Sequence, residues 1–236
     1  MTQNPPKIAA NLNTNFLKLL AIISMSFDHF GKAFFPDIIW FPIIGRLAFP
    51  IFAYCIVVGC LYTHDFKGYI TRLGAFAVLS QPIYVLAHYP SWQGLMDNLW
   101  NFNILFTLIL GAFAVQGLKG KNWLMFAISL AIVSFFNFDY GINGILLMMM
   151  FFIFREKPYI SILACTVMLG SAFLSPDPDG LNLFGRMVDI QGFAVLALIP
   201  IFIKTNFKIN INKYFFYAFY PAHLLAIFLI RLAIGG

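Results

Sequence analysis

The apolar stretch at residues 15–35, NFLKLLAIISMSFDHFGKAFF, decides the fold class of this chain. A helix rises about 1.5 Å per residue and the hydrocarbon core of a bilayer is about 30 Å thick, so about 20 mostly apolar residues span it. The stretch has that length. It also contains the polar residues Lys18, Asp28, His29 and Lys32. Because such residues are costly in lipid, we expect them to face protein or a polar cavity.

The composition of the whole chain agrees with a membrane protein. Hydrophobic residues make up 61% of the 236 residues and charged residues only 10%, whereas a soluble domain carries about 25% charged residues. Glu156 is the one glutamate of the sequence. So few charges cannot cover a surface that faces water, but the apolar side chains can cover one that faces lipid.

Similar apolar runs recur along the chain and predict an all-α, polytopic transmembrane bundle in one domain, residues 1–236. Prolines and glycines separate most of the runs. The boundary near residues 137–144 is the weakest, so whether residues 122–154 form two full spans is left open. We expect nine spans at residues 15–35, 41–62, 69–88, 98–118, 122–138, 140–154, 158–175, 189–204 and 214–234.

The distribution of charged residues predicts the orientation. With the N-terminus inside, inner segments hold eleven of the fifteen lysines and arginines, outer ends hold three, and Arg46 lies in a span. Cytoplasmic loops carry such an excess, so we expect N-in and C-out topology, and the net charge of +6 does not indicate nucleic-acid binding. The inner residues are Lys7, Lys18, Lys67, Arg72, Lys119, Lys121, Arg155, Lys157, Lys204, Lys208 and Lys213; the outer basic ones are Lys32, Arg186 and Arg231; and the outer aspartates are Asp37, Asp97, Asp139, Asp177, Asp179 and Asp189.

The cysteines indicate neither a disulfide framework nor a metal site. Cys55, Cys60 and Cys165 all lie in apolar runs and have no zinc-ligand spacing. We therefore expect buried free thiols and no bound metal. The first apolar segment is too long for a signal peptide and is polar at its far end, so we expect the mature protein to retain it.

Lys18 and His29 are predicted to share one face of the first helix. Eleven residues at about 100° each amount to three turns plus about 20°, and the rise between the two is about 16 Å. Lys18 then lies at the cytoplasmic rim and His29 at or beyond the middle of the membrane. Asp28 is better placed to pair with Lys32, four residues further on.

Other spans carry polar residues at a similar predicted depth, in the middle or outer half of the membrane. We interpret them as lining one polar cavity, which is joined to the cytoplasm past Lys18. Each also has a structural interpretation: histidine, glutamine and asparagine bridge membrane helices, and an arginine near the surface extends its charge into water. The residues are His29, Arg46, Gln81, Asn103 and His223, with Tyr220 and Pro221 beside His223.

These residue types allow group transfer. A histidine with a pKa near neutrality can act as a general base. An arginine or asparagine can stabilise an oxyanion, and a lysine on the cytoplasmic side can hold a phosphate. Metalloprotease, serine-hydrolase and glycine-rich phosphate-loop motifs are absent from the sequence.

Four blocks resemble the TraX family, the F-pilin N-acetylases, in their order from the first helix to the last. They are LKLLAIISMSFDHFG at 17–31, GRLAFPIFAY at 45–54, NILFTL at 103–108 and YPAHL at 220–224. Lys18 and His29 also resemble the pattern of a basic residue, ten residues and a histidine in the broader integral-membrane acyltransferases, which modify surface glycans.

The resemblance implies acetyl transfer from acetyl-CoA, the donor substrate, with no metal. By this analogy His29 is the base or the acetyl-accepting residue, next to Asp28. The residues that would bind the donor are Lys18, Arg72 and Gln81. The remaining residues would stabilise the reacting carbonyl or complete the site: Arg46, Asn103, Tyr220 and His223.

Our first hypothesis is a multi-pass acetyltransferase of the bacterial inner membrane, acting on a pilin N-terminus or a surface glycan at the outer side. The acceptor, an acetyl-histidine intermediate and the oligomeric state are left open. A second hypothesis is a proton-coupled transporter or channel with a relay through Asp28, His29 and His223. However, the internal repeats and paired broken helices of such proteins are not evident. The third is a non-enzymatic assembly or scaffold protein.

Overall fold

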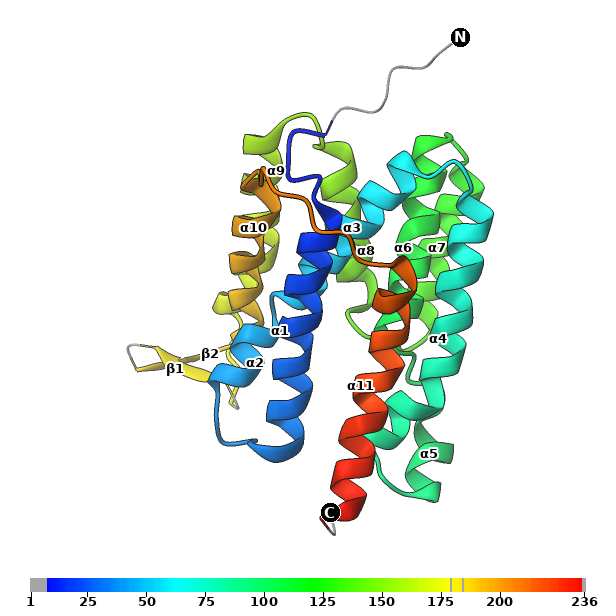
Figure 1. The fold of residues 1–236 in the computed structure, drawn as a ribbon. Coiled ribbons are helices and arrows are strands. Elements are labelled where there is room, and N and C mark those ends of the chain that lie inside the picture. Colours follow the sequence, from blue (N-terminus) through cyan, green and yellow to red (C-terminus); the bar gives the residue numbers. More distant parts are fainter. Residues whose placement is uncertain (1–7, 179, 184, 235–236) are drawn as a thin grey trace. The chain divides into compact units, whose positions relative to one another are not determined.

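The computed structural model describes residues 8–178, 180–183 and 185–234. Lys7 and Asp179, both used in the orientation argument, lie outside the described residues. The described part is helical apart from one short hairpin (Figure 1). The all-α prediction is therefore confirmed.

The chain divides into two units, and each is described here by itself. The first unit runs to Cys55 and resumes from Met150 to Asn210, and the second comprises Ile56–Met149 and the chain from Ile211 onward. Helices α3 (Ala48–Tyr62) and α8 (Gly141–Ile153) contribute residues to both units.

The first unit begins with α1 (Thr14–Phe34), which is one continuous helix as predicted. Asn13 caps it, since its side chain accepts a hydrogen bond from the Phe16 backbone N–H. The short helix α2 (Trp40–Gly45) returns alongside α1, and the two lie side by side in blue in Figure 1. Their backbones approach closely where Gly45 faces Asp28, because a Cβ atom on that glycine would overlap the carboxylate side chain.

The rest of the first unit contains the hairpin and the least regular helix. The helical part comprises α9 (Pro158–Gly170) with the 3-10 turn η1 (Ser171–Leu174), and the 3-10 helix η2 (Ile190–Ala197) followed by α10 (Leu198–Phe202). Between them, β1 (Leu181–Leu183) pairs antiparallel with β2 (Arg186–Val188). The hairpin was not predicted.

The prediction of a regular α-helix at 189–204 is wrong for its first half, where η2 is a 3-10 helix of eight residues. A 3-10 helix rises about 2.0 Å per residue, so η2 is longer than an α-helix with the same number of residues. Gly192 packs against the Phe173 ring, which leaves no room for a side chain at this position.

The second unit is built on α4 (Phe66–His88), α6 (Ile104–Lys119), α7 (Trp123–Phe135) and α11 (Lys213–Ala233). Helix α4 packs on both α6 and α11, and α6 packs on α7. A small apolar core joins Ala114, Val133 and Ile145 from α6, α7 and α8.

The prediction of one helix from residue 98 to 118 is wrong at its start. A separate short helix, α5 (Trp92–Asn98), ends there, and α6 begins only at Ile104. Asn103 determines this boundary, because its side chain accepts from the Leu105 N–H and so caps the new helix. By contrast, the uncertain region 122–154 forms two separate helices, α7 and α8.

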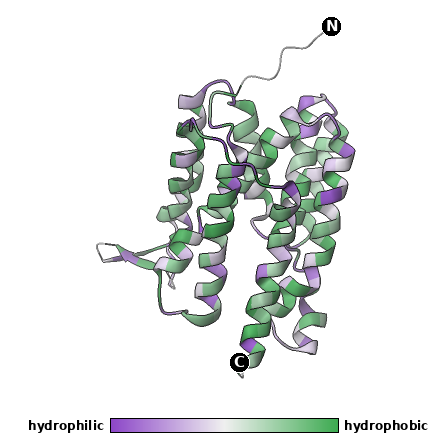
Figure 2. Ribbon diagram, in the orientation of Figure 1, coloured by the Kyte–Doolittle hydropathy of each residue, from purple (hydrophilic) through white to green (hydrophobic). Residues whose placement is uncertain are grey.

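Within the described residues, three helical segments are long and apolar enough to cross a membrane: Trp40–Tyr62, Phe66–His88 and Lys213–Ala233. Five further apolar helices are shorter. Helix α1 has 21 residues but carries three charged ones. Large apolar side chains are exposed on the helices, for example Phe135 at 84% and Tyr159 at 85%. Most residues along the helices are hydrophobic, as the green ribbon of Figure 2 shows. Such a surface is typical of contact with lipid or with a partner.

Candidate functional site

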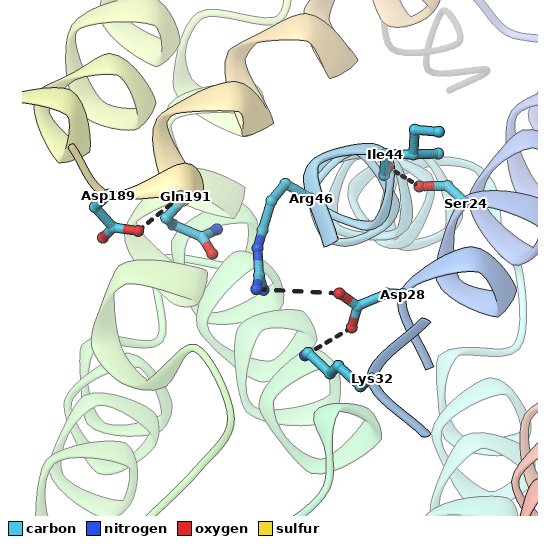
Figure 3. A network of polar contacts seen from close by, with 7 residues as sticks. All are labelled: Ser24, Asp28, Lys32, Ile44, Arg46, Asp189 and Gln191. Atoms are coloured by element: carbon cyan, nitrogen blue, oxygen red, sulfur yellow. Dashed lines mark hydrogen bonds and ion pairs between the residues drawn. The ribbon is translucent and has the colours of Figure 1, made fainter. Parts of the chain in front are cut away.

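The structure joins α1 and α2 through a cluster of three charged side chains, shown in Figure 3. The Lys32 ammonium lies 2.8 Å from Oδ2 of Asp28, and Nη2 of Arg46 lies 4.0 Å from Oδ1. The i, i+4 pair was predicted from the sequence and is confirmed. The contact with Arg46 was not predicted, because it depends on how α2 folds back onto α1.

The geometry of this charged cluster leaves it with an excess of positive charge. Asp28 is buried, with 8% of its surface exposed, while Lys32 extends further into solvent. One carboxylate faces two cations, and at 4.0 Å the contact with Arg46 is an ion pair rather than a hydrogen bond. Arg46 is therefore oriented by Asp28 but not fully neutralised by it. Such an arginine suits an anionic group or a developing oxyanion.

A hydrogen bond from a side chain to the backbone also holds α1 against α2. The Ser24 hydroxyl of α1 donates to the carbonyl oxygen of Ile44 in α2. This bond lies one helical turn before Asp28, as Figure 3 shows. Ser24 and Gly45 together hold the two helices close enough for Arg46 to reach the carboxylate.

His29 follows Asp28 on α1, and both His29 and Lys18 are half-buried. Because α1 is unbroken from Thr14 to Phe34, the predicted spacing of three turns between them is retained. Thus His29 is the next residue after Asp28 on α1, and an ammonium lies on the same helix nearer its N-terminus.

In the second unit, Gln81 and Asn103 form an amide cluster between α4 and the start of α6. The Asn103 Nδ2 donates to the Ala77 carbonyl at 2.9 Å and to Gln81 Oε1 at 2.8 Å. Gln81 Nε2 donates to the carbonyls of Leu99 and Asn101 at 3.0 and 2.8 Å. Both N–H groups of Asn103 Nδ2 are thus engaged. Donation to an oxyanion would require one of these bonds to break.

Tyr220 and His223 lie together near the middle of α11, which continues through Pro221. Nδ1 of His223 lies 2.8 Å from the Phe219 carbonyl, and the Phe219 and Tyr220 rings lie 5.2 and 5.7 Å from the imidazole. Donation to that carbonyl requires the proton on Nδ1, and Nε2 is then the acceptor nitrogen of the neutral ring. Helix α4 contributes Arg72, which hydrogen-bonds the Tyr217 side chain on the same α11.

The structure therefore brings the predicted residues together in separate groups. Asp28 pairs with Arg46 next to His29, Gln81 pairs with Asn103, and Tyr220 pairs with His223. The first group lies in one unit and the other two in the second. A single cavity shared by all of them stays a prediction.

Two pockets of the described residues are lined by other side chains. One, of about 580 Å³, lies in the first unit between residues 8–15 and 204–210. The other, of about 300 Å³, lies in the second unit and includes Tyr84, His88 and Asp139. None of the nine predicted site residues lines either pocket. The feature of the sequence that could have indicated the larger pocket is its row of alternate asparagines at 11, 13 and 15, just before and within the first turn of α1.

Among the described residues, no group of three or more histidine, cysteine or acidic side chains lies together so that it could hold a metal ion. Cys55, Cys60 and Cys165 are buried free thiols, as predicted. The polar groups that the structure assembles suit acid–base and electrostatic chemistry.

Together these features define a class: a helical protein with apolar helices of membrane-spanning length, which carry ionisable side chains. Comparison with known proteins identifies the family. The model of the TraX family, described as TraX protein, matches residues 13–231, and the chain therefore belongs to that family.

Several curated proteins are similar to the chain. It is 27% identical to the "probable fimbrial assembly protein FimC, serogroup H1" of Dichelobacter nodosus, over 88% of this chain and 91% of that protein. It is 28% identical to "Protein TraX" of Escherichia coli (strain K12), over 57% of this chain and 53% of that protein. An uncharacterised protein of Rickettsia prowazekii is 28% identical over 68% of this chain and 64% of its own length. No solved structure matches the chain.

Proposed function

We propose that this protein is a membrane-bound acetyltransferase that moves an acetyl group from cytoplasmic acetyl-CoA to an amine or hydroxyl acceptor at the outer side of the bacterial inner membrane. The observation that carries the proposal is α1. This helix is continuous and holds Lys18 and His29 three turns apart, and Asp28, the residue before His29, forms ion pairs with Lys32 and Arg46. Membership of the TraX family supports it.

The proposed topology has nine spans, with the N-terminus inside and the C-terminus outside. Its support is the agreement between apolar runs and helices, together with the excess of basic residues in alternate loops. Several helices are short for a bilayer of about 30 Å. Shorter helices are compatible with a bundle in which irregular backbone lines a polar interior.

The proposed chemistry needs only side chains and the donor. The acceptor nitrogen or oxygen attacks the thioester carbonyl, its proton passes to His29, the carbon–sulfur bond breaks, and the sulfur of CoA takes the proton. Arg46 stabilises the oxyanion that forms at the carbonyl. Asp28 orients Arg46 through the contact described above.

The remaining predicted residues serve binding in this proposal. In the first unit, Lys18 is assigned to the donor on the cytoplasmic side. In the second unit, Arg72 is assigned to the donor, and Tyr220 and His223 to the acceptor. Gln81 and Asn103 are assigned to the donor and the reacting carbonyl, and each must exchange one hydrogen bond of the amide cluster to take part. For the acceptor, the name of the Dichelobacter nodosus relative refers to fimbrial assembly, which supports a pilin subunit or a surface glycan.

The test is acetyl transfer by the full chain purified in detergent, measured as CoA release from acetyl-CoA and as acetylated pilin or glycan by mass spectrometry. We expect His29→Ala to lower the transfer rate by about a hundredfold or more, because a general base contributes about 10²- to 10⁴-fold. The matched control is His64→Ala, which removes an exposed histidine and should leave the rate unchanged.

Two outcomes would contradict the proposal. If His29→Ala transfers acetyl as fast as the unmodified chain, His29 has no part in the reaction. If the unmodified chain releases no CoA with any acceptor yet still supports pilus assembly in cells, the protein acts as a scaffold.

A further inference from the structure

The larger pocket of the first unit has the volume and walls of a ligand site, yet none of the residues assigned above lines it. Its volume of about 580 Å³ lies within the range of about 300–1,000 Å³ that is typical of small-molecule sites. One wall is the segment at residues 8–15, which leads into α1. The other is the segment at residues 204–210, which follows α10.

Hydrogen bonds of alternate asparagines join the two walls. Asn11 Oδ1 accepts from the Thr205 hydroxyl at 3.3 Å, Asn13 donates to the Phe207 carbonyl at 2.7 Å, and Asn15 donates to the Ile209 carbonyl at 2.8 Å. The two segments lie about 190 residues apart in the chain. Because side chains tie their backbones together, the walls are preformed without a ligand, which lowers the entropy cost of binding one.

The charge of the lining favours an anion. Lys204 and Lys208 both line the pocket and are exposed, whereas none of the lining residues is acidic. Neutral hydrogen-bond donors lie among them, including Asn206 and Asn210. The first turn of α1 adds a partial positive charge of about half a unit. Two ammonium groups and several amides on a preformed wall form the donor set that binds phosphate oxygens.

We propose that this pocket binds a phosphate ester, held by Lys204 and Lys208 against the asparagine-tied walls. The identity of its carrier rests on the proposed function, in which the phosphates are those of the CoA donor. An anionic phospholipid headgroup offers the same chemistry. Both lysines fall on the side of the membrane that the charge distribution assigns to the cytoplasm, where each of these phosphates is found.

The experiment measures binding to the full chain in detergent with three soluble probes: acetyl-CoA, adenosine 3′,5′-bisphosphate and the phosphate-free fragment pantetheine. The double variant Lys204→Gln, Lys208→Gln removes both charges. The control variant, Lys67→Gln with Lys157→Gln, removes two exposed lysines that do not line the pocket. A second arm compares thermal stabilisation of the same proteins by nanodiscs of phosphatidylglycerol and of phosphatidylcholine.

We expect the pocket variant to weaken binding of acetyl-CoA and of the bisphosphate by about tenfold or more, since each lysine makes a hydrogen bond to a charged group. Lys204→Arg with Lys208→Arg should restore much of the affinity, and the control variant should bind like the unmodified chain. If only the stabilisation by phosphatidylglycerol is lost, the phosphate ester belongs to lipid.

The proposal is overturned if the pocket variant binds both nucleotides and responds to phosphatidylglycerol as the unmodified chain does. Its failure is distinguishable from that of the proposed function. Unchanged binding of every probe, together with normal acetyl transfer by the pocket variant, would refute the site alone. Lysine-dependent binding of the bisphosphate by a chain that never transfers acetyl would refute the acetyltransferase alone.

Discussion

The charged cluster of α1 and α2 and the amide cluster of α4 and α6 both join two helices through polar side chains, but they use their hydrogen-bonding capacity differently. In the amide cluster, both N–H groups of Asn103 and both of Gln81 are donated to protein oxygens. In the charged cluster, Asp28 faces two cations, and its contact with Arg46 is an ion pair at 4.0 Å. In the first arrangement every amide N–H is engaged, whereas the second is held by ion pairs of one carboxylate with two cations.

The comparison makes a first prediction about stability in the amide cluster. Asn103→Ala should lower the free energy of unfolding by about 3 kcal/mol, because it removes a helix cap and the hydrogen bonds of a buried amide to the Ala77 carbonyl and to Gln81 Oε1. Thermal unfolding followed by tryptophan fluorescence in detergent measures the change. Asn122→Ala is the control, since Asn122 also caps a helix but is exposed, and it should cost only about 1 kcal/mol.

A cost for Asn103→Ala no larger than that of the control would mean that burial adds nothing to this cap. The amide cluster would then stabilise the fold no more than an exposed helix cap does, and its contrast with the charged cluster would not hold.

A second prediction concerns the close crossing of α1 and α2. Gly45→Ala should cost about 1–3 kcal/mol, because the added Cβ overlaps the Asp28 side chain and the helices must separate. It should also lower acetyl transfer, since Arg46 then loses its contact with the carboxylate. The control is Gly74→Ala in the middle of α4, where a Cβ meets no other atom.

Alanine is the better helix former, so the control should be neutral or stabilising by about 0.5–1 kcal/mol. Equal unfolding midpoints for the two variants would show that the crossing tolerates expansion and that Gly45 does not control the charged cluster.

The third prediction has the smallest effect on stability. Asp28→Asn keeps the shape of the side chain but removes the charge facing Arg46 and Lys32, and should cost about 1–2 kcal/mol. It should also slow acetyl transfer by about tenfold, because Arg46 is no longer oriented. Lys32→Gln is the comparison: this residue is more exposed, and its pair should contribute less than about 1 kcal/mol.

The third prediction separates catalysis from stability within one cluster. A loss of transfer that merely follows the loss of stability in both variants would assign Asp28 the same structural role as Gln81.

The structure also shows which kinds of feature could be predicted from the residues. Most helix limits followed from apolar runs and breakers, and the pair of Asp28 with Lys32 followed from a spacing of four residues, since both depend on local geometry. The contact of Arg46 with Asp28 and the amide cluster depend on side chains brought together from different helices. Sequence spacing carries no information on such pairs.

The break between α5 and α6 shows the same limit. Residues 98–118 are apolar enough for one helix, but Asn103 is held by Ala77 and Gln81 on another helix, and so begins a new one. A tertiary contact thus overrides a local preference. The larger pocket is a further case, because its walls come from opposite ends of the chain.

By itself, the sequence determined the class of this protein: few charges and recurrent apolar runs leave helices as the economical way to satisfy the backbone in lipid. It also determined the face that Lys18 shares with His29, because helical periodicity is a property of one segment. Only the tertiary structure decided which polar residues have their hydrogen-bond donors fully engaged between helices and which form ion pairs instead. That distinction depends on burial and on partners distant in the chain, as Asn103 and Arg46 show.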